Sequence, residues 1–488
     1  MILKTQVFLV GAGPGDPLLL TRRAMMVLAI ADVVLYDFLI PESCLRYAKK
    51  AELICVGKQK GNHTKTQSEI HDLISQFVAQ SKIVVRLKGG DPAIFGRLGE
   101  EMAFLTKQRI SFDVVPGVSA ASSVPLTCGV SLTHRDFSRS VAYMTGSISL
   151  DVSLNDIDFP QADTIVVFMP TFQFERLIDC LLLKTRFTQQ TPVLLVHRGF
   201  SAFQKISNST LGKVVVDRDQ QGIDHPCLLV VGKVVDHASC FEDINFRLLS
   251  GQRVWLTRLS DFTAHLHDQL SFLGADTSFL PLVELKKNNN SLLQISADFL
   301  TSFQFLVFTS AFAVNTFFDF CFSLGLDSRF FSFLKIVSIG DKTTLALRSF
   351  GIVPNDQAME ASQQGILDVL PDSFKGKSVF YPGSKHASDL MMKELKLRGA
   401  DVTYLSIYEP HFLKSTQDII STDYVVFLSG SAVESFYRSY ALDTVFIAIC
   451  FGSATACVLK KYKQDLIYVC DKPDAESIIS LISSLHFL

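Results

Sequence analysis

A glycine-rich run near the start of the chain is the first place where residue types suggest chemistry. Residues 10–16 read Val-Gly-Ala-Gly-Pro-Gly-Asp and follow the apolar stretch 7–9. A loop with so few side chains lets a ligand reach backbone N–H groups at the end of a buried strand. Asp16 stands where a dinucleotide fingerprint needs glycine, and residues 17–19 lack the Lys-Ser/Thr ending of a phosphate loop. The run predicts a small-molecule site other than NAD or ATP, although a plain strand-to-helix turn would also explain it.

Three further motifs combine glycine turns with basic side chains. They are residues 86–101, which contain Arg-Leu-Lys-Gly-Gly-Asp-Pro, residues 115–120 and residues 132–135. The cations beside these turns are Arg86, Lys88, Arg97, Arg135 and Arg139. Such a cluster could bind a substrate with several carboxylates, since each charge-assisted hydrogen bond is worth about 1.5–3 kcal/mol. Solvated surface charge is the simpler explanation for part of the set.

Strands and helices alternate through the first half of the chain and place these motifs at strand ends. Apolar runs predict strands at 6–10, 32–36, 52–56, 82–87, 112–115, 141–145, 164–169, 192–197 and 227–231. Helical patterns lie between several of them, for example at 18–30 and 67–80. This alternation predicts an α/β fold. The pattern loosens over 236–247 before a new strand at 253, so we expect a domain boundary near 245–251.

The second half of the chain contains an internal repeat of four short blocks. The blocks that begin at Gly251, Gly274, Val307 and Gly340 recur, in the same order, at Gly376, Gly399, Val426 and Gly452. The third block is a strand followed by Ser, and the fourth block is a Gly-x-x-Thr turn. Both blocks place hydroxyls and N–H donors at the carboxyl ends of strands, where open α/β sheets bind ligands. The repeat predicts two similar lobes with a cleft between them, but each Ser or Thr could equally be a simple helix N-cap.

The bulk composition narrows the classes of protein. The chain has 488 residues, of which 48% are hydrophobic and 19% charged, with a formal net charge of −2. This balance gives no basic field for nucleic acid. The 10 cysteines form no metal-binding spacing and fit reduced thiols. No apolar run approaches the roughly 18 residues of a membrane span. We expect a cytoplasmic protein without a metal, a nucleic-acid partner or a membrane partner.

Taken in order, the N-terminal motifs resemble those of the tetrapyrrole methyltransferases. The matching segments are Val10–Thr21, Ala31–Asp37, Gly57-Lys58, Gln67–Ile70, Arg86–Glu101, Pro116–Ala120 and Leu132–Arg135. Within this family the chain is most similar to the uroporphyrinogen-III C-methyltransferases, because Asp37 follows Tyr36, and the resemblance covers about residues 5–236. It implies two α/β subdomains with S-adenosylmethionine bound in the cleft between them.

The resemblance also implies roles for particular residues. Asp37 would be the proton acceptor and Lys58 the proton donor, and the cations named above would bind substrate carboxylates. The cofactor would be bound by Pro14, Gly89, Gly90, Asp91, Ile94, Ser119, Ala120, Met169 and Gly199. The chain departs from the family pattern at Leu98, Ser131, Ser147 and Pro170.

The second half, about residues 251–488, resembles the uroporphyrinogen-III synthases through its repeat, Thr257-Arg258, Phe308-Thr309-Ser310 and Tyr408. This resemblance implies two flavodoxin-like lobes, one of about 251–284 and 410–488 and the other of about 285–409, with the chain crossing between them near 282–287 and 406–412. Tyr408 would be the candidate acid, and no cofactor is implied. The residues expected to bind carboxylates are Thr257, Arg258, Ser310, Thr343, Ser429 and Thr455. Phe312 and Thr344 depart from the family pattern.

Together the two resemblances predict a methyltransferase domain at 1–245 fused to a synthase domain at 250–488. The fusion would cyclise hydroxymethylbilane to uroporphyrinogen III and methylate that product at C2 and C7, giving precorrin-2 for siroheme or cobalamin synthesis. The methyltransferase family implies a homodimer and tetrapyrrole partners. Two alternatives stay open: residues 251–488 could be a non-catalytic tetrapyrrole-binding module, and the N-terminal half could methylate RNA or a protein.

Overall fold

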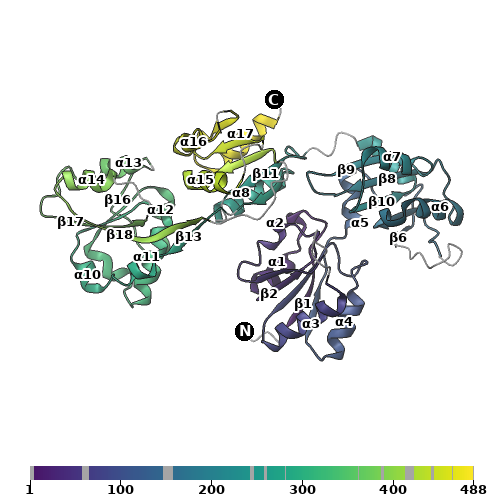
Figure 1. Cartoon of the computed structure of the whole chain (residues 1–488), viewed down its shortest axis with the longest axis horizontal. Helices are drawn as coiled ribbons and strands as arrows, with labels where there is room; N and C mark the ends of the chain where they lie inside the picture. Colours follow the sequence, from purple (N-terminus) through teal and green to yellow (C-terminus); the bar gives the residue numbers. More distant parts are fainter. Residues whose placement is uncertain are drawn as a thin grey trace. The chain divides into compact units, whose positions relative to one another are not determined.

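A computed structural model of the chain describes residues 5–57, 65–146, 158–241, 247–257, 261–280, 282–360, 362–385, 390–412, 422–440, 445–463 and 465–486. The fold separates into two compact units. The first comprises Met1–Leu280, Ile419–Leu428 and Asp443–Leu488, and the second comprises Pro281–Asp418 and Ser429–Leu442. The described residues form four β-sheets whose strands alternate with helices along the chain, so the predicted α/β class is confirmed (Figure 1). No helix among them has both the length and the apolar character needed to cross a membrane.

The first sheet has five parallel strands in the order β3-β2-β4-β1-β5. The strands are β1 Val7–Gly11, β2 Val33–Tyr36, β3 Glu52–Cys55, β4 Val84–Lys88 and β5 Phe112–Val115. The helices are η1 Pro17–Leu19, α1 Arg22–Ile30, α2 Glu42–Leu45, α3 Gln67–Ala79 and α4 Leu98–Lys107. Every residue of β1 and β4 is buried, as expected for parallel strands covered on both faces.

The helix expected at 18–30 is interrupted, which corrects that prediction. A short 3-10 turn ends at Leu19, and α1 starts at Arg22 because the hydroxyl of Thr21 accepts a hydrogen bond from the Ala24 N–H. The N–H of Ala24 lies in the first turn of α1 and has no partner within the helix, so the Thr21 hydroxyl supplies its acceptor. Helix α3 begins at Gln67, as predicted, behind a capping box formed by Thr66 and Glu69, and ends one residue earlier than predicted.

The second sheet has the order β6-β7-β10-β8-β9, with β6 and β7 parallel and the other neighbours antiparallel. Its strands are β6 Val141–Thr145, β7 Thr164–Phe168, β8 Pro192–His197, β9 Lys205–Thr210 and β10 Cys227–Val231. The helices are α5 Ala120–Ser123, η2 Pro125–Cys128, η4 Pro170–Gln173, α6 Phe174–Lys184, α7 Val214–Gln221 and η5 Lys233–Phe241. The sequence did not predict β9, because this edge strand is polar and largely exposed.

The third sheet, also in the first unit, has the order β12-β11-β19-β20-β21, and each of these strands is parallel to its neighbours. Its strands are β11 Arg253–Leu256, β12 Asp276–Phe279, β19 Tyr424–Phe427, β20 Ile447–Cys450 and β21 Ile467–Val469. The helices next to these strands in sequence are α8 Asp261–Phe272, α16 Ser453–Leu459 and α17 Ala475–His486. Leu266, Leu270, Ile478 and Ile482 bring α8 and α17 into one core with the strands.

The fourth sheet lies in the second unit and has the order β13-β18-β17-β14-β15-β16. Its strands are β13 Val283–Lys287, β14 Phe305–Phe308, β15 Lys335–Ser338, β16 Asp356–Gln357, β17 Ser378–Ser384 and β18 Asp401–Phe412. The helices are α9 Asn289–Leu292, α10 Ala297–Thr301, α11 Ala311–Ser323, η6 Ser328–Phe333, α12 Asp341–Ser349, α13 Gln363–Val369, α14 Leu390–Leu397 and α15 Gly430–Ser439.

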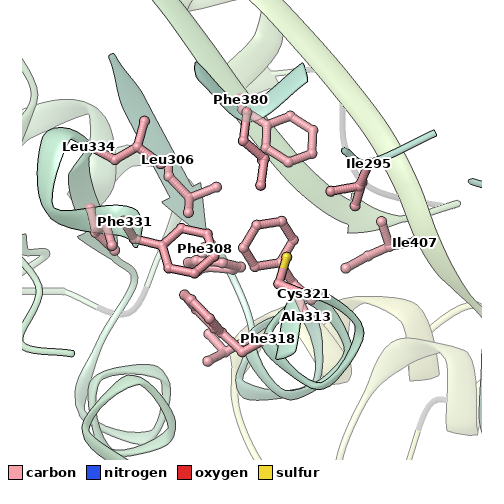
Figure 2. Close-up of a cluster of buried hydrophobic side chains, with 14 of the residues drawn as sticks. Ile295, Leu306, Phe308, Ala313, Phe318, Cys321, Phe331, Leu334, Phe380 and Ile407 are labelled. Atoms are coloured by element: carbon pink, nitrogen blue, oxygen red, sulfur yellow. The ribbon is translucent and has the colours of Figure 1, made fainter. Parts of the chain in front are cut away.

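One core of the second unit is built largely from phenylalanine (Figure 2). Phe308 on β14 and Phe380 on β17 face Phe318 and Cys321 on α11, and Phe331 closes the cluster (Figure 2). Phe318 and Phe331 meet edge to face at 5.0 Å between ring centroids, a favourable geometry for aromatic pairs. The cluster fixes the position of α11 against the strands, and with it the residues at the start of that helix.

The sequence repeat and the sheets do not coincide. The third sheet takes β11 and β12 from the first copy of the repeat and β19 and β20 from the second. The fourth sheet takes β14 and β15 from the first copy and β17 and β18 from the second. Within the fourth sheet, β13 and β18 pair antiparallel, with Val283 opposite Phe412 and Lys287 opposite Tyr408. This pair occupies the segments where the chain was expected to cross between lobes.

Candidate functional site

The glycine-rich motifs of the N-terminal half meet at one pocket of about 780 Å³. The loops that follow β1 and β4 are joined there by two backbone hydrogen bonds, from Gly90 N to Gly13 O (2.7 Å) and from Gly13 N to Gly90 O (3.2 Å). A Cβ on Gly117 would lie 2.2 Å from Gly90 O, so the backbones approach too closely for any larger residue at that position. The pocket therefore depends on glycine for its construction as well as for ligand access.

All nine residues expected to bind the cofactor line this pocket. They are Pro14, Gly89, Gly90, Asp91, Ile94, Ser119, Ala120, Met169 and Gly199. Gly89 has open space where a Cβ would stand, which leaves its backbone accessible. Asp91 is fixed by hydrogen bonds from the N–H groups of Ala93 (2.7 Å) and Gly117 (3.3 Å). A carboxylate beside the apolar side chains of Ile94 and Met169 suits a cationic sulfonium better than a phosphate.

Asp37 lies in the wall of the same pocket, directly after β2. Its side chain is 36% exposed, and its Oδ1 is 2.5 Å from Nη2 of Arg86. Nη1 of Arg86 donates to the carbonyl oxygens of Leu35 (3.3 Å) and Leu87 (3.1 Å). The guanidinium is thus held on several sides, and the carboxylate is both ion-paired and accessible from the pocket.

The five predicted cations do not form one cluster, because two are buried and three are exposed. Arg86 and Lys88 are buried, and both bond to Glu101, which has no exposed surface. Burial lowers the pKa of Lys88, an effect that the charge of Arg86 reinforces and that of Glu101 opposes. Arg97 instead forms an exposed ion pair with Glu100. Of the five predicted cations, Lys88 alone is among the described residues that line the pocket.

The remaining N-terminal predictions fall outside this pocket or outside the described residues. Arg135 and Arg139 are exposed, and Nε of Arg139 donates to the backbone carbonyl of Arg135. Lys58 lies outside the described residues. Substrate binding by these cations stays a prediction. In the part of the chain that the structure describes, no group of three His, Cys, Asp or Glu side chains is placed to hold a metal ion.

In the second unit, hydroxyl groups of Tyr381 on β17 and Tyr408 on β18 reach Thr309 and Ser310, which follow β14. Oη of Tyr408 lies 3.0 Å from Oγ of Ser310, and Oη of Tyr381 lies 3.1 Å from Oγ1 of Thr309. Oγ of Ser310 also accepts from Ala313 N and so caps α11. Burial raises the pKa of Tyr381, so this phenol keeps its proton at neutral pH. Phe312 packs edge to face on Tyr408 and completes the setting of the ring.

The other hydroxyls expected to bind carboxylates have more local surroundings. Ser429 caps α15 through Ala432 N, and Oγ1 of Thr257 donates to the carbonyl of Val426. Thr343 and Thr455 are buried near the starts of α12 and α16. Arg258 lies outside the described residues. The N-cap role weighed for these positions is confirmed for Ser310 and Ser429, and carboxylate binding at all six stays a prediction.

In the methylase half, Glu101 bonds to Arg86 and Lys88, and its motif alone indicates no role for it. It follows Glu100 in the same motif, and composition cannot distinguish the two. Helical spacing could have done so, because Glu101 lies four residues before the buried Leu105 and three after Leu98, on the face of α4 that packs against the sheet.

Comparison with known proteins gives the families of both halves. The family model of tetrapyrrole (corrin/porphyrin) methylases matches residues 6–215. A uroporphyrinogen-III C-methyltransferase of Methanocaldococcus jannaschii is 42% identical over 234 residues, which are 47% of this chain and 97% of that protein. The chain belongs to the tetrapyrrole methylase family. Its C-terminal half matches the model of uroporphyrinogen-III synthase HemD over residues 264–480. The polypeptide is therefore a fusion of a tetrapyrrole methylase with a uroporphyrinogen-III synthase, two enzymes of tetrapyrrole biosynthesis.

One relative spans both halves. The porphyrin biosynthesis protein HemD of Ruminiclostridium josui is 29% identical over 491 residues, which are 97% of this chain and 96% of that protein. Among solved structures, a uroporphyrin-III C-methyltransferase of Thermus thermophilus covers 49% of this chain at 35% identity, with a TM-score of 0.42. A uroporphyrinogen III synthase from the same species covers 49% of the chain at 16% identity, with a TM-score of 0.39.

Proposed function

We propose that the methylase half transfers two methyl groups from S-adenosylmethionine to C2 and C7 of uroporphyrinogen III and releases precorrin-2. The observation that most supports this proposal is the single pocket of about 780 Å³, which joins all nine expected cofactor positions to Asp37. Its apolar walls and the fixed carboxylate of Asp91 suit the sulfonium cofactor. The same features disfavour methylation of RNA, because a phosphate backbone would meet carboxylates there.

When bound, S-adenosylmethionine supplies a sulfonium methyl group that an electron-rich pyrrole carbon attacks as the C–S bond breaks. The pocket residues hold the reacting groups in line, and alignment of this kind can supply as much as about 7–11 kcal/mol. Gly89 and Gly90 lie at the carboxyl end of β4, where their backbone is open to the ligand. Gly199 cannot be enlarged without displacing Val124, because a Cβ there would lie 2.7 Å from one of its methyl groups.

Asp37 takes the proton that the tetrapyrrole loses after methyl transfer. A new O–H bond forms on the carboxylate, and the electron pair that bound the proton to the tetrapyrrole stays in the ring system. Arg86 holds the carboxylate in place before the transfer, through the 2.5 Å contact of its Nη2 with Oδ1. A positioned base of this kind typically accelerates a reaction by about 10²–10⁴-fold. Lys58 completes the proposed acid–base pair as proton donor.

For the synthase half we propose cyclisation of hydroxymethylbilane to uroporphyrinogen III without a cofactor. Tyr408 donates a proton to the departing hydroxymethyl oxygen, the C–O bond breaks, and water leaves. The contact with Ser310 orients the Tyr408 hydroxyl, and the N-cap bond from Ala313 fixes Ser310 in turn. The hydroxyls and helix N-termini of the lobes bind the substrate carboxylates.

The proposal includes the domain boundaries, 1–245 and 250–488, and a homodimer formed through the methylase half. Tetrapyrroles are its partners, and neither nucleic acid nor a membrane takes part. We place the reactions in the cytoplasm because the nine described cysteines are all free thiols, as a reducing compartment favours.

One assay tests both activities together. The full chain is incubated with hydroxymethylbilane and labelled S-adenosylmethionine, and the products are separated by isomer and methylation state. We expect doubly labelled precorrin-2. Uroporphyrinogen I alone, which forms spontaneously, would reject the synthase and leave a binding module in its place. Uroporphyrinogen III without label would reject the methyltransferase.

A further inference from the structure

Glu101 occupies the centre of a buried charge network beside the methylase pocket. Its Oε1 accepts from Lys88 Nζ (2.9 Å), Arg86 Nε (3.2 Å) and Gln67 Nε2 (3.2 Å). The side chain has no exposed surface. Its second oxygen, Oε2, is buried and has no hydrogen-bond partner among the described residues. A carboxylate in this position is costly to bury, so its retention calls for a functional explanation.

Strand and helix geometry bring the network together. Arg86 and Lys88 are two residues apart on β4, so they face the same side of the sheet as Val84. That side is covered by α3 and α4, whose apolar residues pack on Val84. Towards the carboxyl end of the strand the apolar layer gives way to the two cations, and α4 supplies Glu101 opposite them.

The network is balanced in charge when Asp37 is included. Arg86 and Lys88 provide two positive charges, and Glu101 and Asp37 provide two negative ones. Arg86 connects the anions, since its Nε faces Glu101 and its Nη2 faces Asp37. Without the charge of Glu101, both cations would have Asp37 as their one remaining carboxylate partner within the network. A carboxylate shared by two buried cations is a poorer proton acceptor.

We propose that Glu101 is a positioning residue for methyl transfer, which holds Arg86 against Asp37 and keeps Lys88 away from it. This inference rests on the proposed role of Asp37. The other groups close to Glu101 are Gln67 and His71 on α3 and Arg97 at the start of α4, whose pKa is raised by its hydrogen bond to Glu100 and also by the charge of Glu101. Burial lowers the pKa of His71, and the charges of Glu101 and Glu100 oppose that shift. Glu101 thus decides how much positive charge acts on the reacting carboxylate.

The test compares three variants of the full chain in methylation of uroporphyrinogen III. In Glu101→Gln we expect kcat to fall at least tenfold, the acidic limb of the pH–rate profile to move, and the Kd of S-adenosylmethionine to change less than twofold. Glu100→Gln is the matched control, because Glu100 is exposed and precedes Glu101 in α4. Its kcat should stay within twofold of the wild type.

The double variant Lys88→Met/Glu101→Gln separates positioning from simple structural support. It removes one charge of each sign, so the pairing of Arg86 with Asp37 is restored. We expect it to recover at least fivefold of the kcat lost in Glu101→Gln at saturating uroporphyrinogen III, and to fold even if the single variant does not; loss of substrate binding by Lys88 would raise KM instead. A double variant with a lower kcat than the single one, or a single variant with wild-type kcat, would overturn the role of Glu101. A wild-type chain inactive on uroporphyrinogen III would instead overturn the proposed function.

Discussion

In the methylase half the group proposed to move a proton is a carboxylate tied to buried ions, whereas in the synthase half it is a phenol tied to one neutral hydroxyl. Asp37 meets Arg86, behind which lie Glu101 and Lys88. Tyr408 instead meets the hydroxyl of Ser310. The difference matches the chemistry, since a base must be ionised before the reaction and an acid must be neutral.

The comparison also shows how each site is fixed. The methylase pocket is built from glycine turns, and at Gly11 and Gly117 the backbones meet so closely that a Cβ would collide. The hydroxyl cluster of the second unit instead sits on a helix whose position is set by the phenylalanine core (Figure 2). The first site should therefore respond most to changes of charge and backbone space, and the second to loss of single hydroxyl groups.

The largest effect should follow loss of the carboxylate. Asp37→Asn should lower kcat for methylation by about 10²–10⁴-fold, because the amide cannot accept the proton. The Kd of S-adenosylmethionine should change little, as measured by calorimetry, and synthase activity should be retained. Normal methylation by this variant would remove Asp37 from the mechanism.

In the synthase half, Tyr408→Phe should slow cyclisation by about 10²-fold, the lower end of the effect of a positioned acid. The measurement is the rate of uroporphyrinogen III formation from hydroxymethylbilane. Tyr381→Phe is the control, since its hydroxyl is bonded to Thr309 and lies on the neighbouring strand β17. Equal losses in both variants would mean that Tyr408 has no special role.

The accessible backbone of Gly89 in the methylase pocket can be tested by a substitution that does not change the charge. Gly89→Ala places a methyl group in open space, so the fold should be kept while the Kd of S-adenosylmethionine rises by about tenfold, or about 1.4 kcal/mol. Gly99→Ala is a control, because Gly99 likewise has open space around it but lies outside the pocket. Unchanged affinity in Gly89→Ala would show that the ligand does not approach this glycine.

The smallest effect separates two helix caps. Ser310→Ala and Ser429→Ala should each cost about 0.5–2 kcal/mol in the free energy of unfolding, because each removes an N-cap. Ser310→Ala should in addition slow cyclisation several-fold, since it removes the partner of Tyr408. Equal cyclisation rates in the two variants would show that Ser310 acts as a cap alone.

Most strands were predictable from local pattern. All nine strands expected in the first half are present. Parallel strands buried on both faces, such as β1 and β4, read as continuous apolar runs. Strand β9 was missed because an exposed edge strand carries no such signal. The nine residues predicted to bind the cofactor line one pocket, since contiguous motifs at strand ends stay together when the sheet forms.

The two families, the α/β class and the positions around the pocket could be read from the amino-acid sequence, because these depend on short segments in a fixed order. The burial of Glu101, the exposure of Glu100, and the carboxylate that Arg86 and Lys88 face inside the protein are set by tertiary contacts. Tertiary contacts also decide which copies of the repeat share a sheet. Burial and strand pairing depend on contacts between residues far apart in the chain, and local composition does not specify them.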